Sequence, residues 1–184
     1  MTSSVHFLIS SSPVGPIELT ETDGALTGVR LLGAHGLSEH GLSEHGLSKH
    51  GLSKHGSGKS KVPAGNSALL RRAQKQLTEY FAGRRRSFDV PVAPQGTAFQ
   101  RAVWAQLSHI PFGATSTYGA IARAVGQPQA ARAVGGAIGA NPLAIVVPCH
   151  RVLAGDRRLT GFSGGDGVPT KVTLLTLEGS EFRA

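Results

Sequence analysis

The sequence contains a single cysteine, Cys149, and it is followed at once by His150 and Arg151. A thiolate is a soft nucleophile suited to accepting an alkyl group by in-line displacement. Cationic neighbours lower the pKa of a thiol, and a histidine can accept its proton, directly or through a bridging water. A lone cysteine is also commonly a buried packing residue. These three residues therefore leave a nucleophile and a structural cysteine both open.

The residues before the cysteine favour a structure that presents it. Residues 145–147 are Ile-Val-Val, three β-branched residues that predict a buried extended segment. Pro148 then predicts a turn that aims the side chain of Cys149 outward. We therefore expect the thiol at the surface, behind an apolar wall.

A pair of short helices is predicted just upstream of this segment. Residues 118–125 and 129–139 have helical composition and are separated by Gly-Gln-Pro, which is typical of a helix-turn-helix. The second helix is rich in alanine and glycine over residues 130–137. Such small residues suit a helix that lies in a nucleic-acid groove, and equally one that packs tightly on another helix.

The remaining elements divide the chain into two predicted domains. Short strands are expected at 5–9, 17–20 and 26–32, and an amphipathic helix is expected from Ser67 to about Gly83. Further helices are expected at 97–107 and 170–177. Prolines near residue 92 predict a boundary there, with an N-terminal domain over 1–92 and a C-terminal domain over 93–184.

A repeat interrupts the first domain. Residues 36–55 are four copies of a five-residue unit, GLSEH twice and GLSKH twice. A period of five forms no single apolar face and each unit contains glycine, so we expect a flexible surface insertion at about 34–66. The recurring histidines raise a metal-binding alternative, but they do not align on one helical face. We therefore predict no metal site.

Composition limits the classes of protein further. The chain has 184 residues, a formal net charge of +8 and a pI near 10.4. This charge favours a polyanionic partner such as nucleic acid or an anionic membrane face, and it fits equally a basic protein with no such partner. One cysteine excludes an intramolecular disulfide and fits a reducing compartment. Residues 1–13 lack the features of a secretory signal, and no apolar run reaches the length of a membrane span. We therefore expect a cytoplasmic protein without a membrane partner.

Several motifs occur in one order along the second half of the chain and resemble those of a known family. They are Pro-Phe-Gly at 111–113, Thr-Tyr at 117–118, AARAVG at 130–135, Asn-Pro at 141–142, PCHRV at 148–152, GFSGG at 161–165 and Glu-Gly at 178–179. PCHRV is similar to the signature of the O6-alkylguanine-DNA alkyltransferases. That family implies an α+β fold, with a small ribonuclease H-like antiparallel sheet plus helix and then a mostly helical winged helix-turn-helix domain.

The resemblance also implies a reaction and roles for its residues. Cys149 would accept an alkyl group from guanine O6 in DNA, irreversibly and once per chain, with thymine O4 as a second substrate left open. His150 would relay the thiol proton through water, and Glu178 would orient that histidine. Asn141 is similar to the hinge residue before the cysteine segment. Tyr118 is similar to the tyrosine that crowds a phosphate and hydrogen-bonds guanine N3.

The predicted DNA-binding face centres on Arg132, the finger that would fill the gap left by a flipped nucleotide. The same resemblance implies that neighbouring small residues face the minor groove: Ala131, Ala133 and Gly135. The substrate pocket it implies is formed by Val152, Ser163, Phe162, Pro148 and Ala144. Phe162 stands where many members have tyrosine, Ala144 is smaller than usual, and the loop at 166–170 is longer.

The implied partner is double-stranded DNA that contains O6-alkylguanine, bound by a monomer near the nucleoid, with cooperative binding along DNA left open. No cofactor motif is present in the sequence. Three other classes of protein are compatible with parts of the sequence: a lesion-binding protein without transfer activity, a helix-turn-helix regulator, and a cysteine hydrolase. Cys149 argues against the first, and the resemblance of Tyr118 and Arg132 to DNA-facing residues of the family argues against the last.

Overall fold

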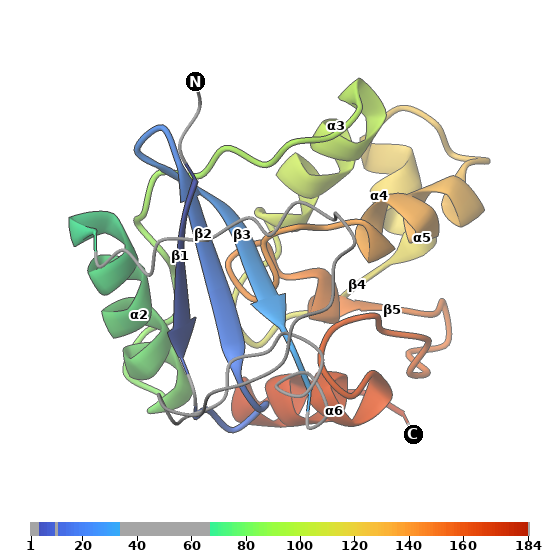
Figure 1. Ribbon diagram of the computed structural model, residues 1–184. Helices are drawn as coiled ribbons and strands as arrows, with labels where there is room; N and C mark the ends of the chain where they lie inside the picture. Colours follow the sequence, from blue (N-terminus) through green and yellow to red (C-terminus); the bar gives the residue numbers. More distant parts are fainter. Residues whose placement is uncertain (1–3, 10, 34–66, 184) are drawn as a thin grey trace, which may run out of the picture.

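The chain begins with a three-stranded antiparallel sheet in the order β1-β2-β3 (Figure 1). The computed structural model describes residues 4–9, 11–33 and 67–183. The three strands are β1 (Ser4–Ile9), β2 (Ile17–Thr22) and β3 (Ala25–Leu31). Asp23 and Gly24 join β2 to β3 with positive φ angles of 51° and 77°, as a tight two-residue hairpin turn requires. The predicted strands are confirmed.

Helix α2 (Ala68–Phe81) packs against β2 and β3. The hydroxyl of Ser67 caps it by accepting a hydrogen bond from the Leu70 amide at 3.0 Å. Its buried side chains are apolar except for Gln76, as an amphipathic helix requires: Leu70, Ala73, Gln76, Leu77 and Tyr80. The apolar spacing therefore predicted which face of this helix would be buried.

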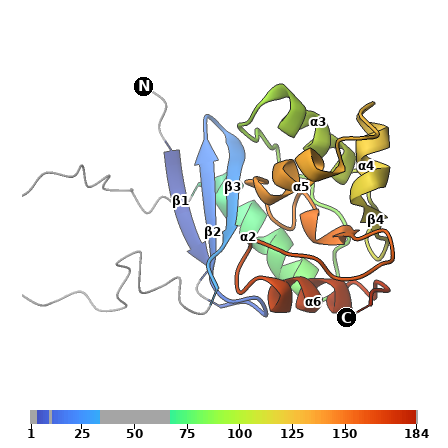
Figure 2. The same ribbon diagram turned by 90° about the vertical axis from the view of Figure 1, so that its right-hand side faces the viewer.

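The second half is mostly helical, as expected. Its helices are α3 (Ala98–Leu107), α4 (Tyr118–Ala124), α5 (Ala131–Gly139) and α6 (Val168–Leu177). Helices α3, α4 and α5 pack on one another, and the indole of Trp104 donates a 2.8 Å hydrogen bond to the Ala137 carbonyl. Figure 2 shows this group on the side of the molecule away from β1, with α6 beneath it. The predicted helix-turn-helix is therefore α4 and α5.

Two short strands hold the cysteine segment beside α4. Strand β4 (Ser116–Thr117) pairs in parallel with β5 (Val152–Leu153). A single 3₁₀ turn, η1 (Cys149–Arg151), precedes β5 directly. The pairing therefore fixes the cysteine turn relative to the start of α4.

The edge of β3 that faces away from β2 joins the sheet to the second half of the chain. Val29 donates a hydrogen bond to the Pro142 carbonyl at 2.8 Å and accepts one from the Ala144 amide at 3.2 Å. Farther along the strand, the Leu31 carbonyl accepts a 3.0 Å hydrogen bond from the Gly165 amide. One strand thus contacts two segments that flank the cysteine in space.

The extended conformation predicted for residues 145–147 is wrong. Ile145 has a φ of 71°, and the segment forms consecutive turns in which the Val147 amide bonds to the Leu143 carbonyl at 2.8 Å. These β-branched side chains are at least partly buried, so their apolar character reflects packing rather than strand pairing. Farther back in the chain, Val92 forms an isolated bridge with Leu26 of β3.

Two expectations about the first half of the chain stay predictions. The repeat at 36–55 and the insertion at about 34–66 lie outside the described residues, and the division of domains at residue 92 stays a prediction. None of the helices in the described ranges is both long and apolar enough to cross a membrane. Within the same ranges, no three His, Cys, Asp or Glu side chains are grouped as metal ligands would be.

The core side chains of the central strand, β2, should contribute strongly to the free energy of unfolding. Leu19 on β2 is fully buried, and Leu19→Ala is expected to lower the free energy of unfolding by about 2–5 kcal/mol because it leaves a cavity in the core. Val168→Ala, at a side chain 40% exposed, is the control and is expected to change it by less than about 0.5 kcal/mol. Urea denaturation followed by circular dichroism measures both. Equal losses in the two variants would contradict this placement of the core.

Candidate functional site

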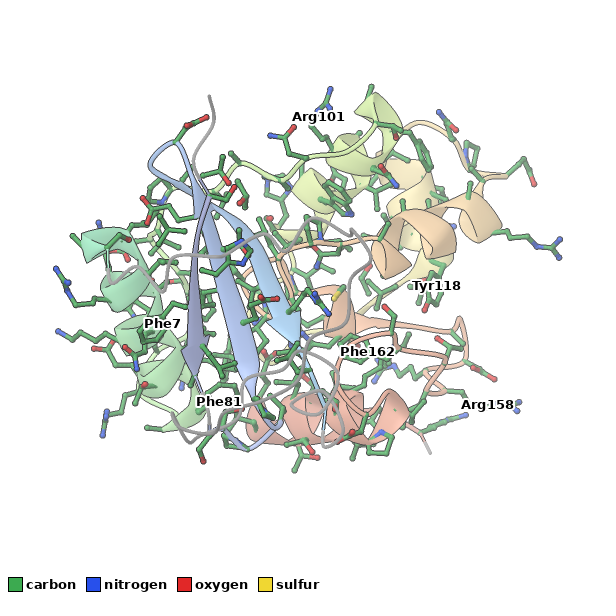
Figure 3. The ribbon with its side chains drawn as sticks, viewed as in Figure 1. Phe7, Phe81, Arg101, Tyr118, Arg158 and Phe162 are labelled. Carbon is green, nitrogen blue, oxygen red and sulfur yellow. The ribbon has the colours of Figure 1, made fainter. Side chains whose placement is uncertain are left out.

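A cavity of about 300 Å³ opens beside the cysteine. Its walls come from α4, α5, η1, α6 and the loop before α6, and they are formed by Tyr118, Gly135, Ile138, Gly139, Cys149, Gly161, Phe162, Ser163 and Lys171. Figure 3 shows Tyr118 and Phe162 on the same side of the molecule, in the region between α5 and α6. The cavity is therefore bounded by both the helix-turn-helix and the glycine-rich loop.

Cys149 lies at this cavity but does not project outward, so that expectation is wrong. Only 6% of its surface is exposed, because the turns at 145–148 direct the 3₁₀ turn inward. Burial raises the pKa of the Cys149 thiol, and a hydrogen bond from Asn141 and the charge of Lys171 oppose this only in part. The resting group is thus a protonated thiol that needs a proton acceptor in order to react.

The carboxylate of Glu178 lies behind the cysteine and orients the neighbouring histidine. The Nε2 atom of His150 lies 2.8 Å from Glu178 Oε1, and both side chains are completely buried. Burial raises the pKa of Glu178, but hydrogen bonds from His150 and Arg151 outweigh it and bring the value to about 2. Glu178 is therefore an anion at neutral pH, and the predicted contact between it and His150 is present.

The other ring nitrogen of His150 is left unoccupied. Its Nδ1 atom is buried and has no hydrogen-bond partner among the described residues. Burial lowers the pKa of His150, so the ring is neutral, and a neutral ring that donates from Nε2 to a carboxylate has an accepting lone pair on Nδ1. The site thus combines a protonated thiol with an adjacent, oriented base.

Arg151 completes the surroundings of Glu178. Its Nε donates to Oε2 at 2.7 Å, its Nη2 to Oε1 at 2.8 Å, and its Nη1 to the Ile110 carbonyl at 2.6 Å. This bidentate pair fixes the plane of the carboxylate. Arg151 lies two residues after the cysteine in sequence, yet its guanidinium pairs with Glu178.

Lys171 is a buried charge that the sequence interpretation did not identify. It is 1% exposed, and its ammonium donates to the carbonyls of Val152 at 2.7 Å and Thr160 at 3.4 Å. Burial lowers the pKa of Lys171 to about 8, and the Cys149 thiolate would raise it. Its spacing could have indicated this burial, because Lys171 lies three residues before the core residue Leu174 and therefore on the same face of α6.

Asn141 links the end of α5 to the cysteine segment. Its Nδ2 donates to the Val147 carbonyl at 2.8 Å, and its Oδ1 accepts from the Leu143 amide at 3.1 Å. Both bonds close the turns that lead into η1. The predicted position at the junction between helix and cysteine is therefore where Asn141 lies.

Of the residues predicted to face DNA, Tyr118 and Gly135 line the cavity, and the others lie in the first turn of α5. Arg132 and Ala133 are exposed, and Ala131 and Gly135 are partly buried. The hydroxyl of Tyr118 lies 2.9 Å from Thr160 Oγ1, and a Cβ at Gly135 would lie 3.8 Å from the Tyr118 ring. The start of α4 therefore lies against the middle of α5 at the cavity wall.

Of the five residues predicted for the substrate pocket, Phe162 and Ser163 line the cavity. Val152 and Ala144 are buried, and the carbonyl of Val152 already accepts the Lys171 ammonium. Pro148 borders a separate cavity of about 360 Å³ on the other side of the cysteine segment. Val152, Ala144 and Pro148 therefore do not line the cavity beside the cysteine.

Comparison with protein families identifies both halves of the chain. Residues 5–94 match the ribonuclease-like domain of 6-O-methylguanine DNA methyltransferase, and residues 98–180 match the DNA-binding domain of the same family. A methylated-DNA–protein-cysteine methyltransferase of Methanosarcina acetivorans is 41% identical, over 96% of this chain and 99% of the relative. One from Mycobacterium bovis is 39% identical, over 96% of this chain and 93% of the relative.

Solved structures agree with this assignment. The crystal structure of the Mycobacterium tuberculosis O6-methylguanine methyltransferase is 37% identical with a TM-score of 0.73, covering 98% of this chain and 96% of that one. A crystal structure of OGT from the same organism in complex with DNA is 39% identical with a TM-score of 0.71, over 95% and 92% of the two chains. Because sequence and fold agree over almost the whole length, this chain belongs to the 6-O-methylguanine DNA methyltransferase family.

Proposed function

We propose that this protein repairs DNA directly by transferring an alkyl group from guanine O6 to Cys149, irreversibly and once per chain. The observation that carries the proposal is a single thiol at a cavity of about 300 Å³, with a neutral histidine and an ionised carboxylate behind it. The names of the relatives, methylated-DNA–protein-cysteine methyltransferases, support the same reaction.

In the proposed reaction the sulfur of Cys149 forms a bond to the alkyl carbon as the bond from that carbon to guanine O6 breaks. The thiol proton passes through water to His150 Nδ1, whose ring Glu178 holds through Nε2. The leaving guanine takes up one proton at N3 from the Tyr118 hydroxyl. The proton that His150 accepted then returns through water to restore the Tyr118 hydroxyl, so that histidine and tyrosine both end in their starting states. Thiol and alkylguanine thus become thioether and guanine, with no net gain or loss of protons.

The damaged nucleotide must leave the duplex to reach this site. A thiol that is 6% exposed cannot contact O6 inside a base stack, and extruding a nucleotide costs a few kcal/mol. We assign Arg132 to the gap left in the duplex because it is exposed near the start of α5, beside the cavity wall. Phe162, Ser163 and the other pocket residues would then contact the extruded base.

The proposed partner is double-stranded DNA, and the DNA complex of the Mycobacterium tuberculosis relative supports it. The exposed or partly buried small residues of α5, Ala131, Ala133 and Gly135, suit close approach to a minor groove. With a net charge of +8, binding is expected to be salt-sensitive and weakly sequence-specific. We further propose that the protein acts as a monomer in the cytoplasm, on DNA of the nucleoid.

The first test removes the nucleophile. Cys149→Ser is expected to abolish transfer and to leave DNA affinity within about twofold, because an alcohol at this site is a far weaker nucleophile. Intact-mass measurement after incubation with a duplex containing O6-methylguanine should show one added methyl group per wild-type chain and none on the variant. Fluorescence anisotropy with the same duplex measures affinity. A methyl group gained by the serine variant would show that another atom is the acceptor.

The second test concerns the finger. Arg132→Ala is expected to slow methyl transfer from duplex DNA by about tenfold, which corresponds to 1.4 kcal/mol of lost stabilisation of the extruded state. Single-stranded DNA needs no gap filling, so its rate should change less. Arg84→Ala removes the same charge at an exposed residue after α2 and serves as the control. Equal rates for wild type and Arg132→Ala on duplex DNA would contradict the assigned role.

A further inference from the structure

Tyr80 reaches the proposed relay from the other half of the chain. It lies in the last turn of α2, is fully buried, and its hydroxyl donates a 2.7 Å hydrogen bond to Glu178 Oε1. Ninety-eight residues separate the two partners in sequence. Because the side chain is completely enclosed, Tyr80 cannot contact DNA or an extruded base.

We propose that Tyr80 is a positioning residue of the alkyl-transfer site, through which the N-terminal half of the chain sets the proton affinity of His150. This inference rests on the proposed function. It assigns a part in the reaction to a residue outside the domain that carries the cysteine and the helix-turn-helix.

The geometry of the carboxylate carries the argument. Oε1 of Glu178 accepts from Tyr80 at 2.7 Å and from Arg151 Nη2 at 2.8 Å, and it lies 2.8 Å from His150 Nε2. Oε2 accepts from Arg151 Nε at 2.7 Å and from the Gly113 amide at 3.4 Å. Tyr80 and His150 therefore share one oxygen. Each donor to that oxygen withdraws charge that would otherwise attract a proton to the imidazole.

The hydroxyl of Tyr80 is held as a donor. Burial, reinforced by the charge of Glu178, raises the pKa of Tyr80, so the phenol stays protonated across the physiological range. Its ring packs edge-on against Phe81 and Phe112, with centroids 5.3 and 6.1 Å away, and lies tilted 5.7 Å from Phe88. These contacts restrict the direction in which the hydroxyl points.

Other charges act on His150 from neighbouring elements. Arg151 on η1 and Lys171 on α6 oppose protonation of the ring, and Glu178 at the end of α6 favours it. Cys149 precedes His150 on the same 3₁₀ turn. Removing the Tyr80 hydroxyl would leave these groups in place. It would, however, strengthen the electrostatic attraction between the Glu178 carboxylate and a protonated His150 ring. The ring would then hold its proton to higher pH and would be a poorer acceptor at low pH.

The test is the single-turnover rate of methyl transfer from a saturating O6-methylguanine duplex, measured between pH 5.5 and 8.5 on Tyr80→Phe. The rising limb of the rate profile is expected to move to higher pH, with a fall of about tenfold at its acidic end. That is part of the roughly 10²- to 10⁴-fold that a positioned proton acceptor contributes. DNA affinity should not change, because Tyr80 is enclosed.

Two further variants separate this role from packing. Leu77→Val perturbs the same buried face of α2 one turn earlier without touching Glu178, and it should lower the melting temperature but keep the wild-type pH profile. Replacing Tyr80 by 3-fluorotyrosine keeps both ring and hydroxyl while making the phenol a stronger donor. It should therefore move the rising limb to lower pH, opposite to Tyr80→Phe, and it remains informative if Tyr80→Phe does not fold.

The outcomes are distinct. If the wild-type protein transfers no methyl group, the proposed function itself fails. If it does transfer, and both Tyr80 variants keep the wild-type profile, the role of Tyr80 is refuted. A loss of transfer rate in Tyr80→Phe that is equal at every pH would also refute it. That pattern is the one expected of Leu77→Val, and it reflects packing alone. Opposite shifts in the two Tyr80 variants would establish it.

Discussion

An ionised carboxylate in the interior determines how the two halves of this protein fit together. Removing such a group from water costs several kcal/mol unless hydrogen bonds and opposite charge compensate it. Glu178 is compensated by His150, Arg151, Tyr80 and the Gly113 amide, which come from η1, α2 and the loop before β4. None of these segments can shift far without leaving part of the charge unpaired. The hydrogen bonds that the buried Glu178 carboxylate requires therefore fix the orientation of His150 next to the cysteine.

The edge of β3 adds a second connection between the halves. Its hydrogen bonds to residues 142 and 144 hold the turns that precede the cysteine, and its bond to Gly165 holds the loop that carries Phe162 and Ser163. The loop also fits closely: a Cβ at Gly33, just beyond β3, would lie 2.6 Å from Asp166 Oδ1. The sheet therefore helps to shape the cavity from behind, although none of its residues lines it.

Sequence patterns predicted the parts of this structure that depend on local order. Alternation located the three strands, and the apolar stripe from Leu70 to Tyr80 located the buried face of α2. The family and the reaction class came from the ordered motifs around Cys149 rather than from periodicity. What local patterns could not predict is burial produced by distant segments. In the sequence, Tyr80 is like any other core aromatic residue, and only the fold brings its hydroxyl to a carboxylate 98 residues away. The inward turn of Cys149 likewise depends on the left-handed backbone of Ile145.

The burial of the thiol has a consequence for the proposed reaction. An exposed thiolate would react with many electrophiles, whereas Cys149 is 94% covered and burial raises its pKa, so it is mostly protonated at rest. Reaction then requires an alkyl carbon in the cavity and removal of the proton toward His150 together. The product is a neutral thioether, a poor leaving group, and the buried His150 and Glu178 act on protons and cannot cleave a carbon–sulfur bond. The arrangement that protects the thiol before reaction thus also explains why each chain would react only once.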